Sequence, residues 1–234
     1  MNRRTFKWPH IILWLASITI ILGCGNVAEN TIDQKPIELL IEGNKRYITS
    51  KVKHPHQNHH RLIEISNSQD PFAVVLSCSD SRVPPEIIFD QGLGDLFVIR
   101  TAGNVIGNYE LASLEYAVIK LNCKVLMVMG HENCGAIKVF SETPLDSLPG
   151  HLNYLTEFIG QEPFSLSRVE HADQNTLYQL TIDNVLYGVN LIRDQSSIIT
   201  ERLKMGELEI YGAIYHVDNG KVEIIEDIVN SPSK

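Results

Sequence analysis

Cys78, His131 and Cys134 are three side chains that could bind one metal ion. Zinc prefers thiolate and imidazole ligands in a tetrahedral shell. His131 and Cys134 are three residues apart at the expected start of a helix, so both could face the same ion. Three protein ligands leave one coordination position open, as catalytic zinc sites do. Iron and copper accept the same ligands, and a Cys78–Cys134 disulfide is the alternative without a metal.

Asp80 and Arg82 are a second pair with a chemical use. Residues two apart in a turn can share a face, so the guanidinium could hold the carboxylate in a fixed orientation. Beside zinc, the Asp80 carboxylate could accept a hydrogen bond from bound water and keep that water aimed. It could instead move onto the metal as a fourth ligand and close the site. A purely structural ion pair is the alternative.

Short, continuously apolar runs predict strands that are covered on both faces. The expected strands are 72–76, 96–99 and 124–129, the expected helices are 36–50, 109–121 and 171–193, and segments 208–217 and 222–225 are expected to form a C-terminal hairpin. This alternation predicts an α/β fold with a mainly parallel central sheet flanked by helices.

Parallel sheets place their chemistry beyond the carboxyl ends of the strands. Cys78 follows one expected strand and His131 follows another, so the fold should bring these distant ligands together. Cys123 falls at the opposite end of the strand that leads to His131, about 25 Å away at roughly 3.3 Å per residue. Cys123 is therefore excluded as a fourth ligand, which favours a catalytic over a structural site.

Residues 1–23 are typical of a bacterial signal peptide, because a basic start is followed by the apolar run 11–22. That run is too short to span a bilayer as a helix, which needs about 20 residues. Residues 21–24 resemble a lipoprotein cleavage box, so we expect Cys24 to become a lipid-modified N-terminus. An ordinary signal peptide and an uncleaved anchor or core helix are the alternatives. Residues 2–7 also resemble a twin-arginine export signal.

The expected organisation is a signal peptide at 1–23, a tether at 24–35, one zinc-dependent domain at 36–229 and a tail at 230–234. We therefore expect an exported protein in the cell envelope or periplasm, held on a membrane by lipid at Cys24. Zinc suits that oxidising setting better than iron or copper, because zinc is redox-inert.

The formal charge is −8, and removal of residues 1–23 makes it −11 because only basic groups are lost. This acidic balance argues against nucleic-acid binding, which needs a basic face. A His-rich stretch is interpreted as a solvated loop rather than as a proton shuttle or second metal site; it comprises His54, His56, His59 and His60.

The sequence closely resembles the β-class carbonic anhydrases over roughly residues 36–228. The motifs that carry the resemblance are Cys78–Val83 and Gly130–Gly135, supported by the segments 42–44, 84–104 and 211–215. The resemblance implies reversible hydration of CO2 to bicarbonate and a proton by zinc-bound hydroxide, with one zinc ion per subunit.

In the family, the residues matching Cys78, His131 and Cys134 bind zinc, and those matching Asp80 and Arg82 form the dyad beside it. The residue matching Asp80 also occupies the fourth zinc position in a closed state at lower pH. Family members build their sites at a dimer interface, so a homodimer or higher homo-oligomer is expected.

Gln91 lies where some relatives place a substrate-binding glutamine, but the spacing to Arg100 is one residue longer, so Gln91 is given no such role. Two thiolates donate more negative charge to zinc than imidazoles do, so we expect activity to rise toward alkaline pH. The alternatives are a CS2 or COS hydrolase on the same scaffold and a non-catalytic protein that binds zinc or bicarbonate. The presence of both Asp80 and Arg82 argues against the non-catalytic protein.

Overall fold

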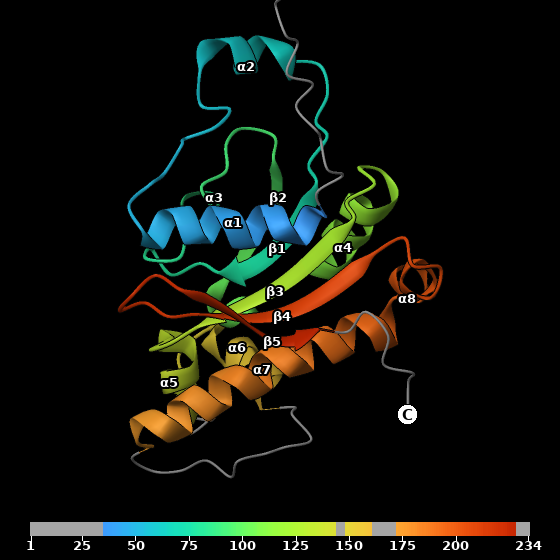
Figure 1. Ribbon diagram of the computed structural model, residues 1–234. Coiled ribbons are helices and arrows are strands. Elements are labelled where there is room, and N and C mark those ends of the chain that lie inside the picture. The colour runs from blue at the N-terminus through green and yellow to red at the C-terminus, as the bar shows by residue number, and fades with distance from the viewer. Residues whose placement is uncertain (1–34, 144–147, 161–171, 228–234) are drawn as a thin grey trace, which may run out of the picture. The chain divides into compact units, whose positions relative to one another are not determined.

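The structure is a computed structural model that describes residues 35–143, 148–160 and 172–227. These residues belong to one compact unit (Figure 1). The predicted signal peptide, Cys24, all of the tether except Lys35, and the C-terminal tail lie outside the described residues. Among the described residues, none of the helices is long and apolar enough to cross a membrane.

Five strands form one sheet in the order β2-β1-β3-β4-β5. The first four are mutually parallel, and β5 is antiparallel to β4. The strands are β1 (Ala73–Cys78), β2 (Leu96–Thr101), β3 (Val125–His131), β4 (Glu209–Tyr215) and β5 (Val222–Asp227). The helices are α1 (Pro36–Ile48), α2 (His59–Glu64), α3 (Pro85–Ile88), η1 (Ala102–Asn104, a 3-10 turn), α4 (Asn108–Ile119), α5 (Gly135–Glu142), α6 (Leu152–Ile159), α7 (Gln174–Gln195) and α8 (Ser197–Lys204).

Helices cover both faces of the sheet, with α1 on one side and α7 on the other (Figure 1). Successive strand residues alternate between the two cores because side chains in a strand point to opposite faces. Ala73 and Val75 pack in the core on the α1 side, whereas Val74 and Leu76 pack in the core on the α7 side. Burial on both faces explains why β1 and β3 are continuously apolar along most of their length.

The sheet order creates one crevice that suits a functional site. From β1 the chain goes to β2 on one side and then crosses to β3 on the other side of β1. In open α/β sheets, ligands bind beyond the carboxyl ends of the strands at such a switch in strand order. Cys78 ends β1 and His131 ends β3, so both side chains lie at this edge.

The predicted fold class is confirmed, including the C-terminal antiparallel pair β4–β5. One local prediction is wrong: His131 ends β3 instead of starting a helix, because its backbone continues the ladder with Tyr215 of β4. The helix expected from residue 171 begins at Gln174, and residue 171 lies outside the described residues. The helix expected at His131 is α5, which begins at Gly135 with Cys134 as its N-cap residue. The short helices α2, α3, α6 and α8 were not predicted.

Candidate metal centre

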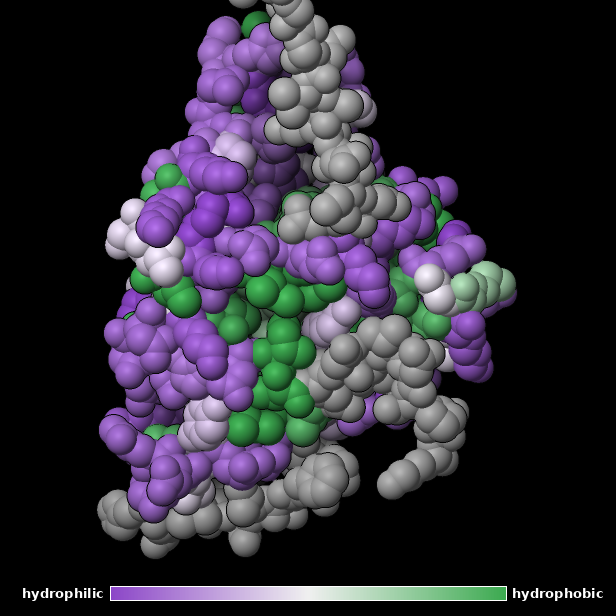
Figure 2. Space-filling view, in the orientation of Figure 1, coloured by the Kyte–Doolittle hydropathy of each residue, from purple (hydrophilic) through white to green (hydrophobic). Residues whose placement is uncertain are grey.

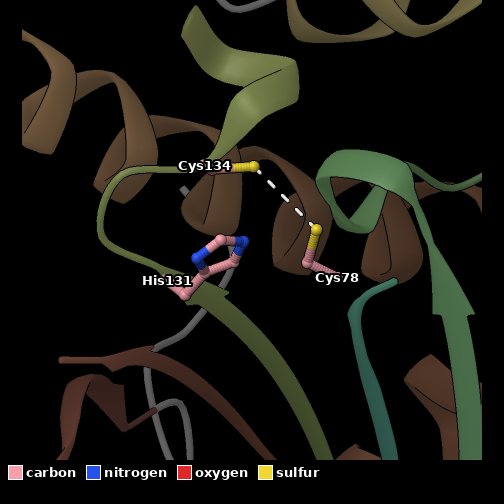
Figure 3. A group of neighbouring side chains, drawn as sticks. All are labelled: Cys78, His131 and Cys134. Atoms are coloured by element: carbon pink, nitrogen blue, oxygen red, sulfur yellow. Dashed lines mark hydrogen bonds between the residues drawn. The ribbon is translucent and has the colours of Figure 1, made fainter. Parts of the chain in front are cut away.

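Cys78, His131 and Cys134 converge from three different elements (Figure 3). Cys78 is the last residue of β1, His131 is the last residue of β3, and Cys134 is the N-cap residue of α5. One ligand atom from each residue lies within 4.8 Å of the other two, and all three side chains are buried. The sulfur atoms of Cys78 and Cys134 are 3.9 Å apart. They are free thiols, so the disulfide alternative is not what the structure shows.

These distances fit a tetrahedral zinc ion. Two sulfurs bound at about 2.3 Å with a tetrahedral angle lie about 3.8 Å apart, close to the observed separation of 3.9 Å. His131 Nδ1 donates to the carbonyl oxygen of Glu132 at 2.9 Å, which leaves Nε2 without a proton in the neutral ring. Within the described part of the chain, this buried Nε2 has no hydrogen-bond partner. A lone pair in that position is what a metal ion requires of a histidine.

The two thiols share a proton unequally. Cys78 Sγ accepts hydrogen bonds from the backbone amides of Asp80 (3.4 Å) and Gly103 (3.3 Å). A hydrogen bond from the Cys134 thiol is the main cause that lowers the pKa of Cys78 to about 4, against the effect of burial. The same contact, together with burial, raises the pKa of Cys134 well above its usual range. The pair therefore holds a thiolate at Cys78 and a thiol at Cys134 before a metal ion binds.

Asp80 and Arg82 form the predicted pair beside the ligands. Arg82 donates through Nε to Asp80 Oδ1 at 2.9 Å and through Nη2 to Oδ2 at 2.8 Å. These hydrogen bonds hold the pKa of the Asp80 carboxyl well below its usual range. Asp80 Oδ2 is 3.9 Å from His131 Nε2. The carboxylate is thus ionised, fixed by Arg82 and placed at the edge of the ligand group.

Arg100 is a site residue that sequence reasoning missed. From β2, its guanidinium donates to the carbonyl of Cys78 at 3.1 Å and to that of Asp80 at 2.7 Å. Arg100 therefore holds the backbone that carries one ligand and the acidic member of the dyad. The sequence signal that could have identified Arg100 was a charged residue near the carboxyl end of an apolar strand. In the sheet, Arg100 pairs with Ser77, the residue before Cys78.

Gly103 and Asn184 support the Cys78 ligand from η1 and α7. Gly103 has a φ of +69°, and a Cβ at this position would lie 2.9 Å from that of Ala136. Its amide donates to Cys78 Sγ, and its carbonyl accepts from Asn184 Nδ2 of α7 at 2.9 Å. Helix α7 thereby fixes the turn that supplies one of the amides to the thiolate.

The other sequence candidates lie outside the ligand group. The Cys123 thiol is buried and donates to the Pro71 carbonyl, as expected of a residue before β3. The Gln91 amide donates to the carbonyls of Leu39 and Phe89. Among the described residues, Cys78, His131 and Cys134 form the one group with metal-ligand geometry.

The His-rich stretch is only partly the loop that was predicted. His54 and His56 lie in a loop, whereas His59 and His60 begin α2, whose first turn is capped by Asn58. His56 Nδ1 lies 2.6 Å from Asp95 Oδ1, so this ring forms a hydrogen bond away from the ligand group.

Comparisons with known proteins agree on one family. The carbonic anhydrase family profile matches residues 73–222. The chain is 38% identical to carbonic anhydrase 2 of Mycobacterium tuberculosis over 200 residues, which cover 82% of this chain and 92% of that protein.

Solved structures give the same result for the fold. The structure of the β-carbonic anhydrase CcaA matches with a TM-score of 0.61 and 29% identity, covering 81% of this chain and 95% of that one. A structure described as one of two tetrameric β-carbonic anhydrases of Sordaria macrospora matches with a TM-score of 0.65 and 22% identity, covering 82% and 98%.

Zinc addition to the metal-free protein should release about one proton per ion at about pH 7.5. Cys78 is already a thiolate, so only the Cys134 thiol has a proton to lose when zinc binds. Two ordinary thiols would release about two. The measurement is a stoichiometric zinc titration in weakly buffered solution with an indicator dye. Cys123→Ser should give the same number as the wild type, and release of two protons would contradict the shared-proton arrangement.

Proposed function

The chain belongs to the β-class carbonic anhydrase family, and we propose that it hydrates CO2 reversibly to bicarbonate and a proton at the Cys78–His131–Cys134 centre. This is the activity of a zinc-dependent carbonate dehydratase, a lyase. One observation carries the assignment to this centre: two buried sulfurs and one buried imidazole nitrogen lie within 4.8 Å of one another, beside a carboxylate that accepts two hydrogen bonds from the Arg82 guanidinium.

Cys78, His131 and Cys134 would hold one zinc ion in each chain. When bound, zinc supplies a Lewis acid that makes water nucleophilic near neutral pH. The protein's part is to present two sulfurs and one imidazole nitrogen in the required arrangement. The carbonyl of Glu132 sets the His131 tautomer, and the amides of Asp80 and Gly103 stabilise the Cys78 thiolate.

Asp80 and Arg82 would orient the reacting water. A carboxylate whose pKa is lowered stays ionised from mildly acidic to alkaline pH, so Asp80 offers only acceptor oxygens there. Arg82 fixes the direction of those oxygens, since both guanidinium contacts would have to break before Asp80 could turn toward the ligands. This pairing favours an open site, in which the dyad would keep the carboxylate off the metal.

Export and lipid attachment are further parts of the proposal. They rest on the basic and apolar pattern of residues 1–23 and on Cys24 in a lipoprotein-like cleavage box. A lipid-anchored enzyme in the cell envelope or periplasm would exchange CO2 and bicarbonate beside a membrane.

Self-association is supported by the surface beside α1. A hollow there is lined by Leu40, Ile41, Asn44, Phe89, Met127, Val222 and Ile224, most of them apolar. Hydrophobic residues gather next to α1 in the view of Figure 2, and Ile41 is 48% exposed. Leu40, Phe89 and Met127 form the buried floor of this hollow, and exposed apolar residues beside it, such as Ile41, favour an interface. The relative from Sordaria macrospora is described as tetrameric. We propose that a second copy of the chain covers this face.

Stopped-flow CO2 hydration by the zinc-loaded protein tests the activity and the dyad together. We expect catalysis above the buffer rate that rises from neutral to alkaline pH, and Arg82→Ala should lower kcat/KM about 10- to 100-fold at unchanged zinc content. Arg202→Ala, which breaks an exposed ion pair with Glu207, is the matched control and should keep full activity. Absence of hydration at full zinc occupancy would sink the proposal, and the same samples would then be assayed with CS2 and COS.

The apolar surface beside α1 predicts that the chain self-associates. We expect a mass at least twice that of the 26.4-kDa chain by light scattering. Ile41→Glu should lower that mass, because a charge would be buried in the interface. Ile119→Glu places the same charge at a residue of α4 that is 40% exposed and should leave the mass unchanged. A wild-type monomer at assay concentrations would refute this assignment.

Lipid attachment is tested by expression of the full chain with a radiolabelled fatty acid. The wild-type chain should incorporate label and fractionate with membranes, whereas Cys24→Ala should remain unlabelled because its sulfur is missing. Cys123→Ala removes a buried cysteine instead and should keep the label. An unlabelled wild-type chain found only in the cytoplasm would exclude both export and anchoring.

A further inference from the structure

His216 lies just beyond β4 and contacts the segment that joins two of the metal ligands. Its Nδ1 is 3.0 Å from Oε1 of Glu132. Glu132 directly follows His131, and Cys134 comes two residues later. Both partners are sheltered, with the His216 side chain 15% exposed and that of Glu132 28% exposed. The contact joins residues 84 positions apart in the sequence.

The contacted segment determines how the ligands are presented. The Glu132 carbonyl accepts from His131 Nδ1 at 2.9 Å and so aims Nε2 at the ligand group. Asn133 has a φ of +55° and carries the chain toward Cys134 at the start of α5. The Glu132 amide donates to the Tyr215 carbonyl at 3.1 Å, and the Asn133 carbonyl accepts from Arg82 Nη2 at 3.3 Å. Displacement of this segment would move one ligand relative to another.

His216 is itself held firmly by the turn between β4 and β5. Its amide donates to the Lys221 carbonyl, and its own carbonyl accepts from the Gly220 amide, both at 2.8 Å. The Tyr178 ring of α7 lies 6.1 Å from the imidazole, measured between ring centres. The backbone of His216 is thus fixed, and its imidazole lies between Tyr178 and the Glu132 carboxylate that it contacts.

We propose that His216 is a positioning residue for the zinc site and acts through Glu132. By anchoring the Glu132 side chain, His216 keeps the carbonyl of that residue in place to accept from His131. The β4–β5 turn thereby contributes to metal retention, although it supplies no ligand. This inference rests on the zinc centre proposed above and extends it to a residue outside the ligand group and the dyad.

A second contact of the same ring supplies a matched control. His216 Nε2 lies 3.3 Å from Oε2 of Glu223, whose side chain is 46% exposed. Glu223 is also 3.6 Å from Lys221 Nζ and belongs to β5, away from the segment between the ligands. Loss of Glu223 removes a carboxylate from the same imidazole without releasing Glu132.

The experiment measures the rate at which the zinc-loaded full chain gives up zinc to an excess of a chromogenic chelator. Removal of a hydrogen-bonding residue behind a zinc ligand weakens binding substantially, so His216→Ala should release zinc about three- to tenfold faster than the wild type. Glu132→Ala should have the same effect, and the double variant should be no faster than either single one, because the two residues act as a unit. His216→Asn keeps a donor near the position of Nδ1 and should restore most of the wild-type rate. Glu223→Gln should release zinc at the wild-type rate.

Thermal melting of the metal-free variants separates positioning from general loss of stability. Equal acceleration by His216→Ala and Glu223→Gln, additive effects of His216→Ala and Glu132→Ala, or a wild-type release rate in His216→Ala would each overturn the inference while leaving the zinc centre intact. A wild-type chain that binds no zinc would overturn the proposed centre and this inference with it.

Discussion

Two sulfur atoms and one imidazole nitrogen lie within 4.8 Å of one another in a buried part of the protein. Buried polar atoms without partners cost free energy, and two neighbouring thiolates would repel each other strongly. The metal-free site avoids the repulsion by keeping a proton on Cys134, but His131 Nε2 stays buried without a partner among the described residues, and the two sulfurs remain in contact. A divalent cation removes both penalties at once, so the surrounding structure is best understood as a frame built to hold these three atoms together.

Much of that frame consists of hydrogen-bond donors directed at the backbone and side chains around Cys78. Arg100 holds the carbonyls of Cys78 and Asp80, and amides from η1 and from Asp80 itself face the sulfur. Donors and positive charge on this side stabilise a thiolate, which is the form that binds metal. The carboxyl ends of β1 and β3 bring the ligands together, and the loops beyond those ends supply the stabilising groups.

The Asp80–Arg82 pair has a different role in the same frame. Its side chains are 19% and 48% exposed, and ion pairs of such exposure contribute little to stability. Its value is geometric, because two parallel hydrogen bonds leave the carboxylate one orientation. The contact between His216 and Glu132 would work in a similar way. It would hold the Glu132 carbonyl, which accepts from His131 and sets the direction of that ligand. Control of direction near the site therefore depends on residues in the segments that follow β1 and β3 and in the turn between β4 and β5.

Much of this could be predicted from the sequence. The apolar runs around Val75 and Met127 predicted buried strands, and Cys78, His131 and Cys134 were predicted as ligands because only a few residue types bind zinc. The predicted pair of Asp80 and Arg82 forms because its members are two residues apart, so local geometry suffices. Arg100, Asn184 and His216 could not be assigned in this way, because their partners lie 20 to 84 positions away in sequence. Their roles depend on strand register and on the packing of α7 and the β4–β5 turn against the sheet, and such contacts exist only once the chain has folded.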